Sequence, residues 1–241
     1  TGGYNTVIGY EAGSELKDGS HNVFLGHYAG YLVSGSRSVY VGYQAGGAES
    51  EPVVHGTLEN VAVGYKAMMH GVLRAGDSVA IGSLAGYNAT GSNNTFVGHE
   101  AGKGGNSSAP YSSGGSNTAV GKSALDGFTT GYSNVAVGRN ALGGVGTGYR
   151  NIGIGHGAAG NITTGNSNVA VGYNALKLAG TTSEQVAVGN NALHTTQTGT
   201  FNTGLGHNTL YQNSSGDNNV AIGYQAGFFG GDKSDNVIVG Y

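Results

Sequence analysis

A nine-residue pattern of alternating apolar and polar positions recurs along the chain. From Asn168 to Leu176 it reads Asn-Val-Ala-Val-Gly-Tyr-Asn-Ala-Leu, and variants of it begin at fourteen places between Asn5 and Asn236. We number its positions one to nine from the Asn. Position five is Gly in every copy, and from Gly121 onward successive copies are 17 residues apart. This period is too short for the common helical and propeller repeats, and it predicts one coil of a β-solenoid per copy.

Positions two to four predict a short strand in each copy. Position four is always aliphatic, and position two is Val, Ile or Thr. Because side chains alternate along a strand, these two positions share one side, which we expect to be the interior of the coil. Position three points to the other side and is never charged. A strand that is apolar on both sides is usually covered on both, so we expect another layer or another chain to cover position three.

Three further positions predict how each coil turns and stacks. The Gly at position five is expected to end the strand at a corner, where a positive φ or a close backbone approach excludes a Cβ. Position eight is Ala in twelve of thirteen complete copies, which indicates a tight internal contact. Position one is Asn in eleven copies, and stacking would align these amides in a column that bonds neighbouring rungs or caps a turn. A polar surface for a ligand is the alternative for that column.

The pattern therefore predicts an all-β fold, a parallel β-solenoid of about 17 residues per coil and 14 rungs. It would occupy residues 1–241 as one repeat domain. Two insertions, at 46–59 and 102–116, interrupt the regular rungs, and each contains one of the two Pro residues. Insertions in a repeat array form surface loops, often on a binding face, although a loop that binds nothing also explains them. The chain begins and ends within the pattern, and we interpret it as a piece of a longer fibre.

Composition and charge exclude several classes of protein. Gly contributes 49 of the 241 residues, but it does not recur at every third position and Pro is nearly absent, which excludes collagen. The net charge is −3 and the ten Lys and Arg are scattered, so we expect no nucleic-acid partner. The absence of Cys excludes a disulfide framework and thiolate metal sites. No apolar run approaches the roughly 20 residues that span a bilayer, so we expect no membrane insertion of this segment.

Position six carries a ring in most copies. It is His at His27, His99, His156 and His207, and Tyr in six other copies. Metal ligation needs several ligands that converge on one point, whereas these His belong to separate rungs. We therefore expect no metal and no other cofactor, and we interpret position six as a solvent-facing column of aromatic and imidazole rings that could stack against sugars. No carboxylate pair recurs at a spacing suited to glycoside hydrolysis and the common hydrolase motifs are missing, so we do not expect an enzyme.

The rungs resemble those of known fibre proteins. Asn134–Gly138 and Asn219–Gly223 resemble head repeats of YadA-like trimeric autotransporter adhesins, and Asn168–Leu176 with its following Thr/Ser-Gly turn is similar to repeats of phage-type tail fibres. The resemblance covers essentially the whole chain. It implies a left-handed parallel β-roll, three chains around one axis, and an extracellular location on a bacterial surface or in a virion fibre. The 17-residue step, the insertions and the Leu or Gly at position nine depart from the adhesin-head pattern, so both origins stay open.

The resemblance also suggests what covers position three. In a homotrimer that position would face the threefold axis, where closed symmetry buries an otherwise exposed apolar stripe. The candidate interface residues are Val7, Phe24, Tyr40, Ala62, Ala80, Phe96, Ala119, Ala136, Ala170, Ala187, Ala221 and Ile238.

The expected function is that of a shaft or head segment of a trimeric fibre that mediates attachment to a cell or surface. The alternative is a glycan-binding module that acts through the insertions and the Tyr/His column, with a cell-surface glycan or another surface receptor as partner. The candidate ligand contacts are then Pro52, His55, Pro110 and Tyr111.

Overall fold

The chain folds into parallel β-solenoid coils. The computed structural model describes residues 2–16, 18–47, 53–57, 59–70, 76–105 and 111–241, and every regular element in these ranges is a strand. The chain divides into two compact units, residues 1–120 and residues 121–241. Each unit stacks coils of about 17 residues, and each coil contributes one three-residue strand to a parallel sheet. The predicted all-β solenoid is confirmed.

Unit 1, residues 1–120, contains seven strands of the repeat. They pair side by side in chain order, each parallel to the next. These strands are β1 (Thr6–Ile8), β2 (Val23–Leu25), β4 (Val39–Val41), β6 (Val61–Val63), β7 (Val79–Ile81), β8 (Thr95–Val97) and β9 (Thr118–Val120).

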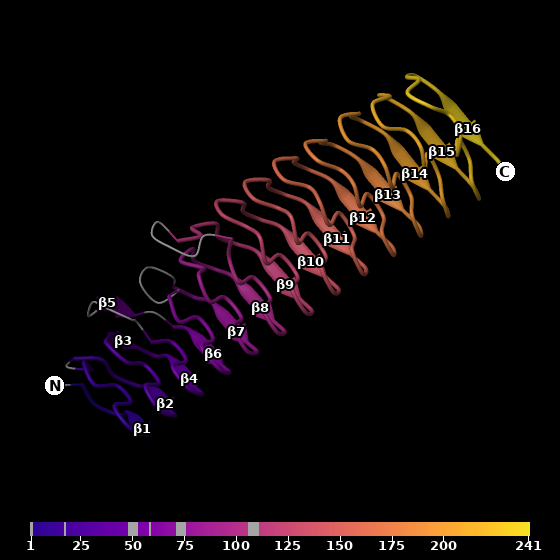
Figure 1. The fold of residues 1–241 in the computed structure, drawn as a ribbon. Coiled ribbons are helices and arrows are strands. Elements are labelled where there is room, and N and C mark those ends of the chain that lie inside the picture. The colour runs from indigo at the N-terminus through magenta and orange to yellow at the C-terminus, as the bar shows by residue number, and fades with distance from the viewer. Residues whose placement is uncertain (1, 17, 48–52, 58, 71–75, 106–110) are drawn as a thin grey trace. The chain divides into compact units, whose positions relative to one another are not determined.

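Unit 2, residues 121–241, repeats the arrangement with seven more strands, again parallel and in chain order. Figure 1 shows that within each unit the strands lie along one side and the return segments along the other. The strands are β10 (Val135–Val137), β11 (Ile152–Ile154), β12 (Val169–Val171), β13 (Val186–Val188), β14 (Thr203–Leu205), β15 (Val220–Ile222) and β16 (Val237–Val239).

Equal positions of successive copies stack directly on one another, as the register Ala170 opposite Ala187 illustrates. The Asn at position one forms a buried ladder: the Asn168 backbone N–H donates to Oδ1 of Asn151 at 3.1 Å, and Asn168 Nδ2 donates to the carbonyl of Thr182 at 2.9 Å. The predicted amide column is confirmed in both roles, because each amide bonds its neighbour and also holds a turn. Such a ladder satisfies polar groups that would otherwise be buried without partners.

The Gly at position five makes a corner that no other residue could make. In all fourteen copies its φ lies between 124° and 138°, a region that is essentially restricted to Gly. A Cβ on Gly64 would also lie 2.6 Å from the carbonyl oxygen of Gly82 in the next rung. Both physical reasons given for the predicted corner are therefore present.

The two sides of the strand are the reverse of the prediction. Ten of the twelve residues proposed for a trimer interface are at most 1% exposed within the single chain, and Ile238 is partly buried. Val7 is 39% exposed because its strand β1 has a neighbour on one side only. Position three therefore fills the coil, and positions two and four point outward. The prediction was wrong because alternation shows which residues share a side, but not which side is inside. The residues concerned are Val7, Phe24, Tyr40, Ala62, Ala80, Phe96, Ala119, Ala136, Ala170, Ala187, Ala221 and Ile238.

The interior of each coil is closed by position three together with positions eight and nine of the return segment. The Ala at position eight is fully buried in most rungs, as at Ala175 and Ala192, which confirms the tight contact expected there. Position nine is buried Leu in most of unit 2, as at Leu176. Because strand and return segment are this close, the coil holds only one large side chain per rung.

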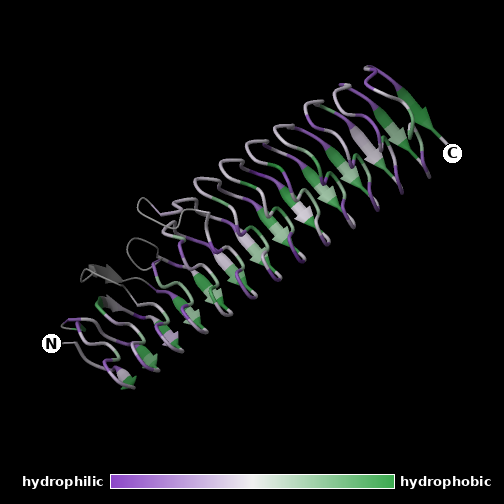
Figure 2. Cartoon of the chain, viewed as in Figure 1, coloured by the Kyte–Doolittle hydropathy of each residue, from purple (hydrophilic) through white to green (hydrophobic). Residues whose placement is uncertain are grey.

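The insertions are partly built into the solenoid. In the first, β5 (Val53–Thr57) pairs in parallel with β3 (Val33–Ser36) of an earlier return segment, forming a separate two-stranded sheet. In the second, Ser112 forms a bridge with Ala89, and its backbone N–H donates to the carbonyl of Asn88 at 3.0 Å. The described parts of both insertions thus pair with return segments, whereas the sequence predicted only surface loops. Figure 2 shows the apolar strands of the rungs beside the more polar turns.

Candidate functional site

The outer face of the sheet is an uncovered apolar surface in each unit. It is formed by positions two and four, which are never charged in any copy. Position four is the more open of the two, with exposed fractions of 40% at Ile154 and 47% at Leu205. Further exposed members of this face are Ile81 and Val120 in unit 1 and Val137, Ile222 and Val239 in unit 2. A regular array of half-exposed aliphatic side chains marks an interaction surface.

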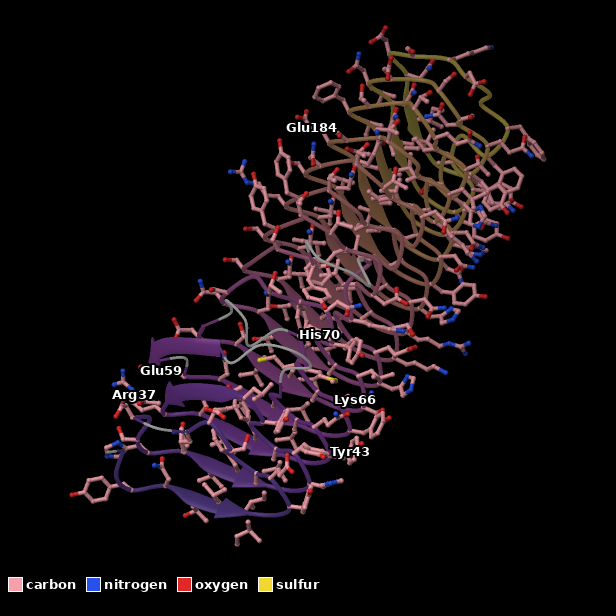
Figure 3. All side chains as sticks on the ribbon, turned by 60° about the vertical axis from the view of Figure 1, so that its left-hand side comes forward. Arg37, Tyr43, Glu59, Lys66, His70 and Glu184 are labelled. Atoms are coloured by element: carbon pink, nitrogen blue, oxygen red, sulfur yellow. The ribbon has the colours of Figure 1, made fainter. Side chains whose placement is uncertain are left out.

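The rings at position six form columns at the surface, as expected. In unit 1, the ring centroids of Tyr10, His27, Tyr43 and Tyr65 follow one another at 5.1, 5.3 and 5.5 Å, and all three Tyr are exposed. The ammonium of Lys66 lies 5.7 Å from the Tyr65 ring. In Figure 3, Tyr43 and Lys66 project from one side of unit 1, away from the exposed pair of Arg37 and Glu59, which is joined at 2.7 Å.

Unit 2 carries shorter columns at the same position. His156 stacks on Tyr173 at 5.4 Å, and Tyr224 stacks between His207 and Tyr241 at 5.2 and 5.4 Å. These rings share a surface but not a point, because each belongs to its own rung. Among the described residues no three His, Asp or Glu side chains gather where they could hold a metal ion.

A second set of ring columns was missed in the sequence. His194, Tyr211 and Phe228 stack face to face at 5.0 Å per step along the return segments of unit 2. Tyr132 and Tyr149 stack at 4.9 Å in the turn before position one. Their 17-residue spacing was the available signal, because any two residues at that spacing in unit 2 lie in the same column. Burial lowers the pKa of the His194 imidazole, and the nearby Lys177 ammonium lowers it further.

The ligand-contact candidates in the insertions do not form one site. Pro52 and Pro110 lie outside the described residues, and His55 belongs to strand β5. Tyr111 is partly buried, and its ring stacks on that of His70 at 4.6 Å. Tyr111 therefore packs against the solenoid wall.

Comparison of the chain with protein-family models, with curated proteins and with solved structures gave no match. The described part of the chain contains no helix that could cross a membrane. The functional argument consequently depends on the surfaces themselves, above all on the outer sheet face.

Proposed function

We propose that this chain is a segment of a homotrimeric fibre that mediates attachment to a cell or another surface, with the extracellular location and left-handed coil that its resemblance to fibre repeats implies. The observation that supports the proposal most directly is the outer sheet face. Its aliphatic side chains at positions two and four are half exposed in the single chain. Soluble proteins seldom leave a regular apolar array of this kind uncovered.

Copies of the same chain are the best partners for this face. Neighbouring rungs are about 4.8 Å apart, so copies aligned in register would bring equal aliphatic columns together along the whole of each sheet. The face has no charged residue at positions two or four that would oppose self-association. In one unit, seven strands give a stripe about 34 Å long and about 10 Å wide. A stripe of that size approaches the largest apolar patches of soluble monomers, and each unit has one.

The interface is therefore moved from position three, as inferred from sequence, to positions two and four. In this arrangement position three remains the core of each coil, and the covering that a doubly apolar strand requires comes from the coil on one side and from partner chains on the other.

The mass in solution tests this proposal. Native mass spectrometry or light scattering should give three times the 24.0 kDa chain mass. Replacing Ile154 and Leu205 by Lys should dissociate the assembly, because six ammonium groups would then be buried in an apolar interface. The matched control replaces Tyr173 and Tyr224 by Lys in the neighbouring position-six columns and should leave the mass unchanged. A folded wild-type monomer would refute the trimer.

A second candidate, a glycan-binding module, is supported by the ring columns. Tyr43, Tyr65 and Tyr173 present exposed rings at position six, and such rings combine an apolar face with a polar tip. This function is compatible with a fibre, because the rings lie beside the outer sheet face and would remain accessible at its edge.

A further inference from the structure

The return segments of unit 2 contain a trough where two columns of side chains are interrupted by Gly. Position seven reads Asn140, Gly157 and Asn174 in three successive rungs, so one amide is missing from that column. Three residues further along each rung, the column contains Gly143 and Gly160 between two charged residues. Together the missing side chains leave a depression of about 370 Å³. This volume lies within the range of small-ligand pockets.

A buried amide oxygen points into this gap without a partner. Asn174 is only 7% exposed, and its Oδ1 accepts no hydrogen bond from any described residue. A Cβ placed on Gly157 would lie 2.6 Å from this oxygen, so the oxygen faces the space that a side chain at residue 157 would occupy. A buried acceptor without a donor costs about 1–3 kcal/mol. A ligand hydroxyl in the trough would remove that cost.

The other polar groups around the trough indicate the class of ligand. Asp126 stands at one end and Lys177 at the other, three rungs or about 14 Å apart. Asn140 and Asn161 add two amides, and His156 adds an imidazole. One carboxylate and one ammonium cancel in charge, so a charged ligand gains little. The mixture of donors and acceptors instead suits a molecule whose groups both donate and accept, as sugar hydroxyls do.

We propose that this trough binds a neutral saccharide, with one hydroxyl donating to Asn174 Oδ1 above Gly157 and others bonded to the amides and charged groups at its rim. The site lies wholly in residues 123–177 and does not depend on the trimer proposed above. It deepens the glycan-binding candidate by placing the sugar on the return segments, apart from the position-six ring columns.

The decisive variant is Gly157→Asn. Its φ of 66° is close to the 51–56° of the Asn residues at the same position in other rungs, so the new side chain completes the amide column without backbone strain. It fills the trough and supplies a donor to Asn174. The matched control is Gly231→Asn, which makes the same change at a φ of 60° where a Cβ meets nothing within 4 Å.

Saturation-transfer NMR and titration of the full chain with a panel of methyl glycosides of neutral hexoses and N-acetylhexosamines test the proposal. We expect at least one glycoside to bind the wild type and Gly231→Asn equally, and to bind Gly157→Asn at least tenfold more weakly, with no loss in the melting temperature of Gly157→Asn. If no glycoside binds the wild type, or if Gly157→Asn binds as well as the wild type does, the site is wrong. A monomeric chain that shows the expected binding would refute the trimer and leave this site intact.

Discussion

The two units build the same coil with opposite distributions of bulk. In unit 1, several rungs place a large ring on the strand and Gly at position nine, as Phe24 with Gly30 and Tyr40 with Gly46 show. A Cβ on Gly30 would lie 2.7 Å from the Phe24 ring. In unit 2 the strand carries Ala or Gly and position nine carries Leu, and a Cβ on Gly153 would lie 2.9 Å from Leu142 Cγ.

This contrast shows that the coil fixes the total volume inside each rung but not the position that supplies it. Either the strand or the return segment can carry the large side chain, provided that the other is small. The Leu at position nine has a positive φ, 52° at Leu176 and 50° at Leu142. The burial of Leu therefore outweighs the cost of about 1–2 kcal/mol for a left-handed residue.

The largest predicted effect comes from converting a rung of unit 1 into the form found in unit 2. Phe96→Ala should destabilise the protein by about 3–5 kcal/mol because it empties the coil. Adding Gly102→Leu should restore much of that loss, since position nine would then fill the same space. Urea unfolding of both variants measures the coupling.

The single variant Gly102→Leu serves as the control for this exchange. It should itself destabilise, because a Cβ there collides with the Phe96 ring. If the double variant is as unstable as the sum of the two single variants, the two positions do not share one space.

The second prediction separates the units by their response to pH. Burial raises the pKa of the Tyr40 phenol in unit 1, so the neutral form is favoured in the fold and its contribution is lost as the pH rises above 10.0. Burial lowers the pKa of His194 in unit 2, so the neutral imidazole is favoured and its contribution is lost as the pH falls below 6.5.

Melting temperatures of Tyr40→Phe and His194→Phe across pH 4 to 11 check this difference. Tyr40→Phe should flatten the alkaline limb of the profile and leave the acid limb unchanged, whereas His194→Phe should do the reverse. Identical pH profiles for the wild type and both variants would show that neither group contributes to the linkage.

The smallest predicted effect concerns position seven, which has a positive φ in both units. Unit 1 places Leu84 there at 59°, whereas unit 2 places Asn191 at 52°. Because Asn tolerates this conformation better than Leu, Leu84→Asn should stabilise by about 1 kcal/mol and Asn191→Leu should destabilise by a similar amount. Differential scanning calorimetry of the two reciprocal variants checks both signs, and a loss of stability in Leu84→Asn would indicate that burial of Leu84 dominates.

Part of the candidate surfaces was predictable from single positions and part was not. The position-six rings were expected at the surface, because rings that replace one another at a fixed place in each rung must form a column. The trough was not expected, because it depends on what is missing at Gly143, Gly157 and Gly160 in adjacent rungs. A gap in a column becomes visible only when the residues before and after it are known to be neighbours in space.

The sequence by itself determined the repeat, the strand at positions two to four, the Gly corner and the amide ladder. Each of these depends on local stereochemistry or on the fixed period of the pattern, and both can be read along the chain. Only the tertiary structure decided which side of the strand is the core. Alternation is symmetric between the two sides, and Ala170 is enclosed only because the return segment brings Ala175 and Leu176 against the strand. The branched side chains that looked like a core, Val169 and Val171, are left on the outside, because a coil this thin has room for one large side chain in each rung and position nine already supplies it.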